Sequence, residues 1–258
     1  MVNHIPMKTQ ITLTLISLLM LCGATNIFAQ DATEIVRKAD TKFKGEKSSY
    51  SEMSMTIVRP KYQRTINFKS WSEGTEKSLT LVTAPAKEKG QTFLKSGNNM
   101  WSWNPTIQRL IKLPPAMMSQ GWMGSDYSND DILKESSLVV DYKHVLKGEE
   151  NVDGRVCYII DLIPLEDSDV VWGKITLWIS KEDDLELKAA YYDEEEYLVK
   201  THLAHNVKTF DERTIPSVME IIPADEEGYK TIVNITDMKF NIPLEANFFS
   251  QQNMKRIR

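Results

Sequence analysis

Residues 50–60 read Tyr-Ser-Glu-Met-Ser-Met-Thr-Ile-Val-Arg-Pro. Met53, Met55 and Ile57 alternate with polar side chains, which is the pattern of a strand that buries one face. The alternation returns in eight later stretches: 66–68, 79–81, 156–162, 174–179, 185–192, 197–207, 217–222 and 231–240. About ten short strands predict a mainly β fold with one large antiparallel sheet, curled or closed into a barrel, since a flat open sheet of that size would expose long edges.

One helix is expected ahead of the strands. Asp31 or Thr33 can cap its free amides, and the residues that follow place apolar side chains on one helical face: Ile35, Val36, Ala39 and Phe43.

The first 29 residues have the features of a cleaved secretory leader. Lys8 precedes the apolar-rich run 11–22, and small residues lead to a cut after Ala29. Lipid anchoring at Cys22 is not expected, because the Leu19-Met20-Leu21-Cys22 context has a bulky Leu directly before the cysteine, where a lipoprotein signal requires a small residue. No later stretch approaches the ~20 apolar residues of a membrane span. We therefore expect an exported protein in which residues 30–258 form a single domain.

Net charge and cysteine content argue against a nucleic-acid-binding protein and against a disulfide-stabilised one. The chain carries a net charge of −5, and removal of the leader takes away one lysine and no acid. Nucleic acid is therefore not expected as a partner, since binding to phosphates requires clustered Lys and Arg in excess. Cys157 is the only cysteine after the leader and lies in a mostly apolar run. A disulfide framework is thus excluded, and a buried thiol is predicted.

Residues 92–125 interrupt the strand pattern and concentrate large apolar side chains. They hold three of the six tryptophans and four of the nine methionines that follow the leader. Residues 89–125 contain no Asp or Glu, although the whole chain has 36, and they carry four cations: Lys89, Lys95, Arg109 and Lys112.

Such a segment suits an adaptable pocket for an apolar ligand with an anionic head. The predicted pocket lining is Phe93, Met100, Trp101, Trp103, Leu113, Met117, Met118, Trp122 and Met123. The cations predicted near its mouth are Lys95, Arg109 and Lys112. The alternative is that these residues are simply central strands and a covering helix of the core.

The residues that follow indicate a hinged flap. Gly121 and Gly124 permit sharp turns, and Asp126, Ser128 or Asn129 can cap a short helix. The predicted lid therefore comprises helices around 114–123 and 128–133.

A calcium loop in this region fails on spacing. Asp126, Ser128 and Asp130 imitate its first three ligands, but Asp131 stands where glycine is required and Ser137 where a bidentate Glu should be. No metal site is predicted.

Catalysis has no supporting pattern in the sequence. The histidines after the leader are His144, His202 and His205, and the last two point to opposite faces of a strand. Nucleophile-elbow, phosphate-loop, zinc-protease and paired-cysteine motifs do not occur. We therefore expect neither an enzyme nor a cofactor.

Several segments, in this order, resemble signatures of the outer membrane lipoprotein-sorting protein family, which is related in fold to LolA, LolB and RseB. They are 84–95 with Lys-Gly-Gln-Thr-Phe-Leu, 99–105, Arg109, 123–127 with Asp130 and Asp131, 241–243 and Phe248. The resemblance implies an unclosed β-barrel of about eleven strongly curved antiparallel strands. Helices would cover its concave face, with an apolar cavity between them.

The function that the resemblance implies is a periplasmic carrier of lipid or lipoprotein. Acyl chains would be held in the cavity for transfer to the outer membrane. An inner-membrane exporter or permease would be the donor and an outer-membrane protein the acceptor, and we expect a monomer. The alternative is an RseB-like periplasmic sensor that binds lipid or peptide and regulates a membrane signalling partner. Because such regulators carry a second domain, the carrier is favoured.

Overall fold

A computed structural model describes residues 31–43, 47–134, 138–168 and 170–258. The chain divides into residues 1–31 and 32–258, and the fold below is that of the second unit. The predicted leader, with Cys22, lies outside the described residues. In the described part of the chain, no helix has the length and apolarity needed to cross a membrane.

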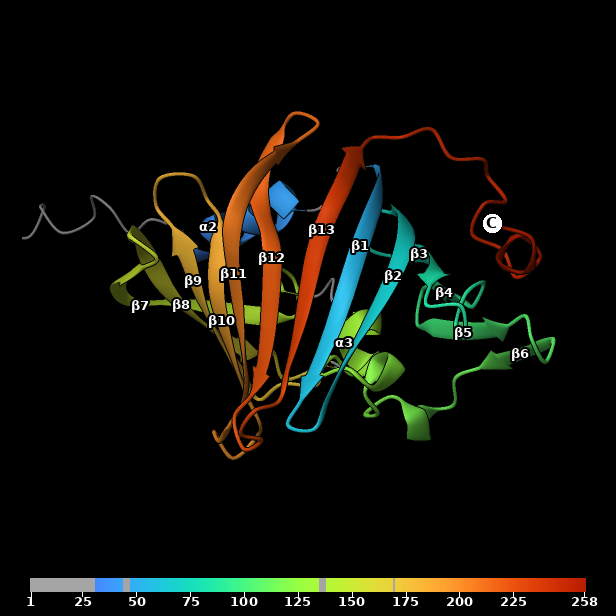
Figure 1. The fold of residues 1–258 in the computed structure, drawn as a ribbon. Coiled ribbons are helices and arrows are strands. Elements are labelled where there is room, and N and C mark those ends of the chain that lie inside the picture. Colours follow the sequence, from blue (N-terminus) through green and yellow to red (C-terminus); the bar gives the residue numbers. More distant parts are fainter. Residues whose placement is uncertain (1–30, 44–46, 135–137, 169) are drawn as a thin grey trace, which may run out of the picture. The chain divides into compact units, whose positions relative to one another are not determined.

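Antiparallel strands form one sheet that curls without closing (Figure 1). Thirteen strands occur in the described residues, where about eleven were expected, and the mainly β prediction is confirmed. Their bounds are β1 Ser48–Arg59, β2 Tyr62–Glu73, β3 Lys77–Ala84, β4 Thr92–Ser96, β5 Asn99–Asn104, β6 Arg109–Lys112, β7 Tyr142–Val152, β8 Arg155–Pro164, β9 Lys174–Ser180, β10 Glu186–Tyr192, β11 Leu198–Phe210, β12 Arg213–Pro223 and β13 Lys230–Phe240.

Residues 92–112 do not interrupt the sheet as the sequence suggested. They form β4, β5 and β6 and extend the sheet to one of its edges. Strand β7 at the other edge was not expected either. Both errors concern strands with few alternating apolar positions, so a period-two search passes over them.

The strand order places one connection across the sheet. The order is β6-β5-β4-β3-β2-β1-β13-β12-β11-β10-β9-β8-β7, so each strand pairs with its neighbours in sequence except where β1 meets β13. That junction aligns Met55 with Val233. Since β6 and β7 are the two edges, the chain between them runs from one edge of the sheet to the other. It contains η1 (Pro115–Met117), η2 (Trp122–Gly124) and α3 (Asn129–Lys134). Residues 113–134 are called the covering segment below.

Helix α2 (Ala32–Phe43) packs on the face toward which the sheet curls, here called the concave face (Figure 1). Its buried side chains Ile35, Val36 and Ala39 contact strands β7 to β10, as the helical spacing predicted. Their sheet partners are Tyr142, Ile160, Leu162, Ile175, Leu177, Ile179 and Ala189.

The covering segment packs on the concave face at the other half of the sheet. It contributes Trp122, Met123, Tyr127 and Ile132 to one apolar cluster. The sheet contributes Met55, Ile57, Ile66, Phe68, Val82 and Val233. The side chains of the covering segment thus complete a core that the strands alone would leave open to water.

Candidate functional site

The predicted pocket residues are divided between the two faces of the sheet. Neighbouring residues of a strand point to opposite faces, and Phe93 and Leu94 of β4 show the division. Phe93 contacts Trp122 on the concave face, with ring centroids 5.3 Å apart. Leu94 packs instead with Trp101 and Trp103 against the C-terminal segment, where η3 (Asn253–Lys255) buries Met254 completely.

Trp101 and Trp103 therefore do not join the other predicted lining residues. Both pair across from residues of β4 that face the C-terminal segment, and the ammonium of Lys255 lies 5.3 Å from the Trp103 ring centroid. The remaining lining residues are spread over the concave side and the covering segment: Phe93, Met100, Leu113, Met117, Met118, Trp122 and Met123. Of these, Met117 is exposed and Met118 half-buried. Phe93, Trp122 and Met123 lie in the cluster beneath the covering segment.

The three predicted mouth cations also separate. Lys95 is buried, and its ammonium donates a hydrogen bond to the carbonyl of Ile132 at 3.5 Å. Arg109 and Lys112 are exposed on the edge strand β6, with Lys112 placed over the Trp101 ring at 5.8 Å. Only Lys95 of the three lies beneath the covering segment.

Trp122 anchors the covering segment to the sheet. Its ring meets Phe68 of β2 edge to face at 5.7 Å between centroids, in addition to the Phe93 contact. Aromatic pairs of this geometry contribute about 1 kcal/mol each beyond their buried area. The side chain is almost fully buried, and among the described residues its Nε1 has no hydrogen-bond partner. Trp122 thus holds the segment mainly by apolar packing.

The covering segment is also tied together internally. The backbone N–H of Ser128 donates to the Asp131 carboxylate at 2.7 Å, and the Asp131 N–H donates to the Ser128 hydroxyl at 3.0 Å, which is a capping box for α3. The Asn129 amide donates to the carbonyls of Met117 and Gln120. At Gly121 a Cβ atom would lie 2.3 Å from the Ser125 carbonyl oxygen, so the turn excludes any side chain there. These bonds make residues 117–131 one hydrogen-bonded body.

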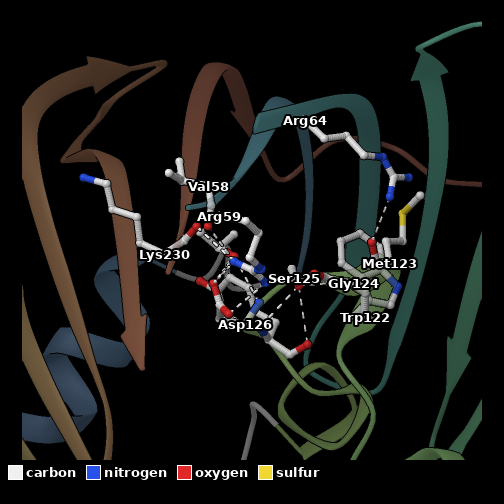
Figure 2. Close-up of polar contacts among 11 residues, drawn as sticks. Val58, Arg59, Arg64, Trp122, Met123, Gly124, Ser125, Asp126 and Lys230 are labelled. Atoms are coloured by element: carbon white, nitrogen blue, oxygen red, sulfur yellow. Dashed lines mark hydrogen bonds and ion pairs between the residues drawn. The ribbon is translucent and has the colours of Figure 1, made fainter. Parts of the chain in front are cut away.

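A bidentate ion pair joins this body to strand β1 (Figure 2). Arg59 Nη2 and Nη1 donate to Asp126 Oδ1 and Oδ2 at 3.0 and 3.1 Å, and the two side chains are 10% and 6% exposed. Thr231 of β13 donates to the same carboxylate at 2.6 Å and accepts from the Asp126 N–H at 3.0 Å. Arg59 Nη2 also donates to the Gly124 carbonyl at 3.0 Å. The hydrogen-bond donors Arg59 and Thr231 that hold the Asp126 carboxylate therefore both belong to the sheet.

A second buried ion pair joins the covering segment to strand β11. Lys200 Nζ is 2.5 Å from Asp131 Oδ2, with side chains 6% and 10% exposed. The same ammonium lies 4.7 Å from the Trp172 ring centroid and 5.4 Å from that of Tyr191. Burial lowers the pKa of Lys200, and the Asp131 charge opposes that shift. Asp131 thus closes the α3 cap and neutralises a buried lysine at once.

His202 lies beside Lys200 on the same face of β11. Its ring stacks at 4.5 Å from Tyr191 and 5.5 Å from Tyr127 of the covering segment. Burial, together with the Lys200 charge, lowers the pKa of His202 to about 3. The imidazole is therefore neutral at physiological pH. In the parts of the chain that the structure describes, no group of three or more His, Cys, Asp or Glu residues is placed to hold a metal ion.

Arg59 and Lys200 were not among the site residues predicted from the sequence, although the sequence indicates burial of Arg59. Arg59 continues the apolar phase of Met55 and Ile57, so the alternation itself turns a cation toward the buried face. Arg64 is likewise in phase with Ile66 and pairs with Glu88 at 2.9 Å. A cation in phase with buried positions needs a carboxylate partner inside the fold.

Comparison with known proteins supports this architecture. A family model described as an uncharacterized-protein family matches residues 74–256. Among curated proteins, no significant relative is found. A DUF1329 family protein from Desulfovibrio piger has a TM-score of 0.78 and 26% identity, over 86% of this chain and 97% of its own.

Two further solved structures share the fold. A LolA superfamily protein from Nitrosomonas europaea has a TM-score of 0.72 and 25% identity, over 86% of this chain and 98% of its own. A domain assigned to outer membrane lipoprotein sorting, from Vibrio parahaemolyticus, has a TM-score of 0.76 at 24% identity, over 89% of this chain and all of its own. With more than half of its length matched by that family model, the chain belongs to the DUF1329 family, and it has the fold of LolA superfamily proteins.

Proposed function

We propose that this protein carries an acylated ligand, a lipid or a lipoprotein, between the concave face of its sheet and the covering segment. The observation that carries the proposal is the construction of the core beneath that segment. One wall of the core belongs to the sheet, and the other belongs to a hydrogen-bonded body whose contacts with the sheet include two buried ion pairs and the packing of Trp122. Movement of that body would expose an apolar surface while the sheet stays intact.

The exposed surface suits an acyl chain. Its sheet side consists of Met55, Ile57, Ile66, Phe68, Val82 and Val233, flanked by Met53 and Met219. Transfer of a 16-carbon chain from water contributes on the order of 12 kcal/mol if every methylene is buried. Unbranched methionine side chains adapt to chains of different shape, so they favour binding without a single fitted cavity. In the closed state Trp122 and Met123 occupy this surface.

The cellular setting follows from the same proposal. The leader at residues 1–29 would export the chain to the periplasm, where residues 30–258 would act as one domain and as a monomer. An inner-membrane exporter or permease would supply the cargo and an outer-membrane protein would accept it, which agrees with the lipoprotein-sorting role in the name of the Vibrio parahaemolyticus domain. Binding and release require no catalytic step.

The direct test is to look for the ligand. Native mass spectrometry of protein purified from its own periplasm should show bound acyl species, and the delipidated protein should take up a fluorescent fatty acid. The variant Trp122→Met, which keeps the core apolar, should be tested in the same two assays. A protein that carries no acyl species and takes up no fatty acid would contradict the carrier. Recovery of a membrane signalling protein as the only partner in a pull-down would support the RseB-like sensor instead.

A further inference from the structure

Two cations of the concave face receive their counter-ions from the covering segment. Arg59 belongs to β1 and Lys200 to β11, whereas Asp126 and Asp131 both belong to the segment. All four side chains are at most 10% exposed. Arg64 differs, because its partner Glu88 lies in the β3–β4 turn and would remain in place if the segment moved.

The two cations lie toward the same end of the sheet, on strands β1 and β11. Lys200 pairs across from Pro223 of β12, and the residue next to Arg59, Val58, pairs across from Lys230 of β13. β11 and β1 are separated by β12 and β13, which places the two backbones about 14 Å apart at the usual strand spacing. The two charges therefore mark one end of the apolar strip formed by the sheet.

Displacement of the segment would leave both cations without their carboxylates. Lys200 would remain against the Trp172 and Tyr191 rings, and Arg59 would remain over the Tyr229 ring, 4.8 Å from its centroid. The aromatic rings, and the Val58 and Lys230 carbonyls that accept from Arg59, would remain, but none of these groups carries a full negative charge. The open state therefore favours anions at the positions that Asp126 and Asp131 leave.

We propose that the anionic head of the acylated ligand, a phosphate or a carboxylate, replaces Asp126 and Asp131 on Arg59 and Lys200. The aspartates of the closed state imitate the head group, and the acyl chain takes the place of Trp122 and Met123. This inference rests on the proposed carrier function and adds the ligand class to it. It assigns the head group to buried cations, whereas the exposed Arg109 and Lys112 remain hydrated and outside the site.

The test compares probes that share one acyl chain. Isothermal titration calorimetry would measure the Kd of the delipidated protein for lysophosphatidylglycerol, palmitate and the uncharged monopalmitoylglycerol. The two anionic probes should bind roughly tenfold more tightly than the uncharged one, which is the gain expected from a charge-assisted hydrogen bond. Inorganic phosphate without an acyl chain serves as the probe for free anions.

Double variants test the two cations without leaving an unpaired buried charge that could unfold the protein. Lys200→Met/Asp131→Asn and Arg59→Gln/Asp126→Asn each remove a cation together with its carboxylate, so neither leaves a lone buried charge. Each should reduce the preference for anionic probes, measured as the ratio of the Kd for monopalmitoylglycerol to the Kd for lysophosphatidylglycerol. Asp131→Asn alone should strengthen lysophosphatidylglycerol binding, because Lys200 loses its competitor. Arg109→Gln, which removes an exposed cation, should retain the full preference.

The possible outcomes distinguish failure of the anion exchange from failure of the carrier function. Equal Kd values for charged and uncharged probes in the unsubstituted protein, or an unchanged preference in both double variants, would overturn the anion exchange and leave the carrier standing. If inorganic phosphate binds as tightly as the acylated anions, the site takes a free anion, and the inference that the anion is a lipid head group would be overturned. Failure of every acyl probe to bind would overturn the carrier function itself.

Discussion

Arg59 and Asp126, 67 residues apart in the sequence, form a bidentate ion pair that fixes the covering segment to strand β1, near the middle of the sheet. Strand β1 is also where the two halves of the sheet meet, since it pairs with β2 on one side and with β13 on the other. The pair therefore couples the closed position of the segment to the only junction in the sheet formed by strands far apart in sequence.

Removal of Arg59 should cost more than removal of the whole pair. Arg59→Gln leaves the Asp126 carboxylate buried beside Thr231, and we expect a loss of about 3 kcal/mol in the free energy of unfolding. The double variant Arg59→Gln/Asp126→Asn should lose clearly less, because no lone charge remains. Urea denaturation of the two single variants and the double variant measures the coupling. Additive losses would show that the pair does not hold the segment.

Trp122 and Trp101 should respond differently, because they lie on opposite faces. Trp122→Ala removes the contacts with Phe68 and Phe93 and should cost roughly 3 kcal/mol. It should also speed hydrogen exchange in residues 117–131. Trp101→Ala loosens the C-terminal segment instead and should leave both that exchange and fatty-acid binding unchanged. Faster exchange at 117–131 in the Trp101 variant would contradict the separation of the two faces.

Stability should depend on pH through His202. Its pKa is about 3 in the folded protein, whereas an unfolded histidine has a pKa of about 6.5. Between these values the unfolded state binds the extra proton, so the free energy of unfolding falls as the pH falls. The expected loss from this group is about 1 kcal/mol between pH 6 and pH 5.

The check is urea denaturation at the two pH values. In His202→Gln, the free energy of unfolding should fall less between pH 6 and pH 5 than in the unsubstituted protein, because the amide does not titrate. His205→Gln, at a half-exposed position on the other face of β11 that pairs with Glu220, is the matched control. An identical pH dependence in the protein and in His202→Gln would show that the imidazole is not held neutral by burial.

Much of the fold could be predicted from local patterns. The alternation at Met53, Met55 and Ile57 predicts β1, and the spacing of Ile35, Val36 and Ala39 predicts α2, because each pattern records which face is buried. The pairing of β1 with β13 has no such local record, since it joins residues almost 180 positions apart.

The candidate site was predicted less well, for two physical reasons. Met100 and Trp101 were assigned to one pocket, yet adjacent residues in a strand point to opposite faces, and Trp101 lies with Leu94 on the other side. The pairs Arg59–Asp126 and Lys200–Asp131 depend on how a long connection lies across the sheet. Spacing along the sequence does not contain that information, although the position of Arg59 in the apolar phase does indicate burial.

The most direct test of the account is a reversible lock on the covering segment. Two hydrogen bonds of 2.6 and 3.0 Å join Asp126 to Thr231, so these two positions are chosen for a pair of engineered cysteines. The variant Asp126→Cys/Thr231→Cys, with Cys157→Ala to remove the buried free thiol, would be assayed for fatty-acid binding in oxidised and reduced forms. We predict that the oxidised form binds no fatty acid and that reduction restores binding. Equal binding by both forms would show that the ligand does not enter beneath the covering segment.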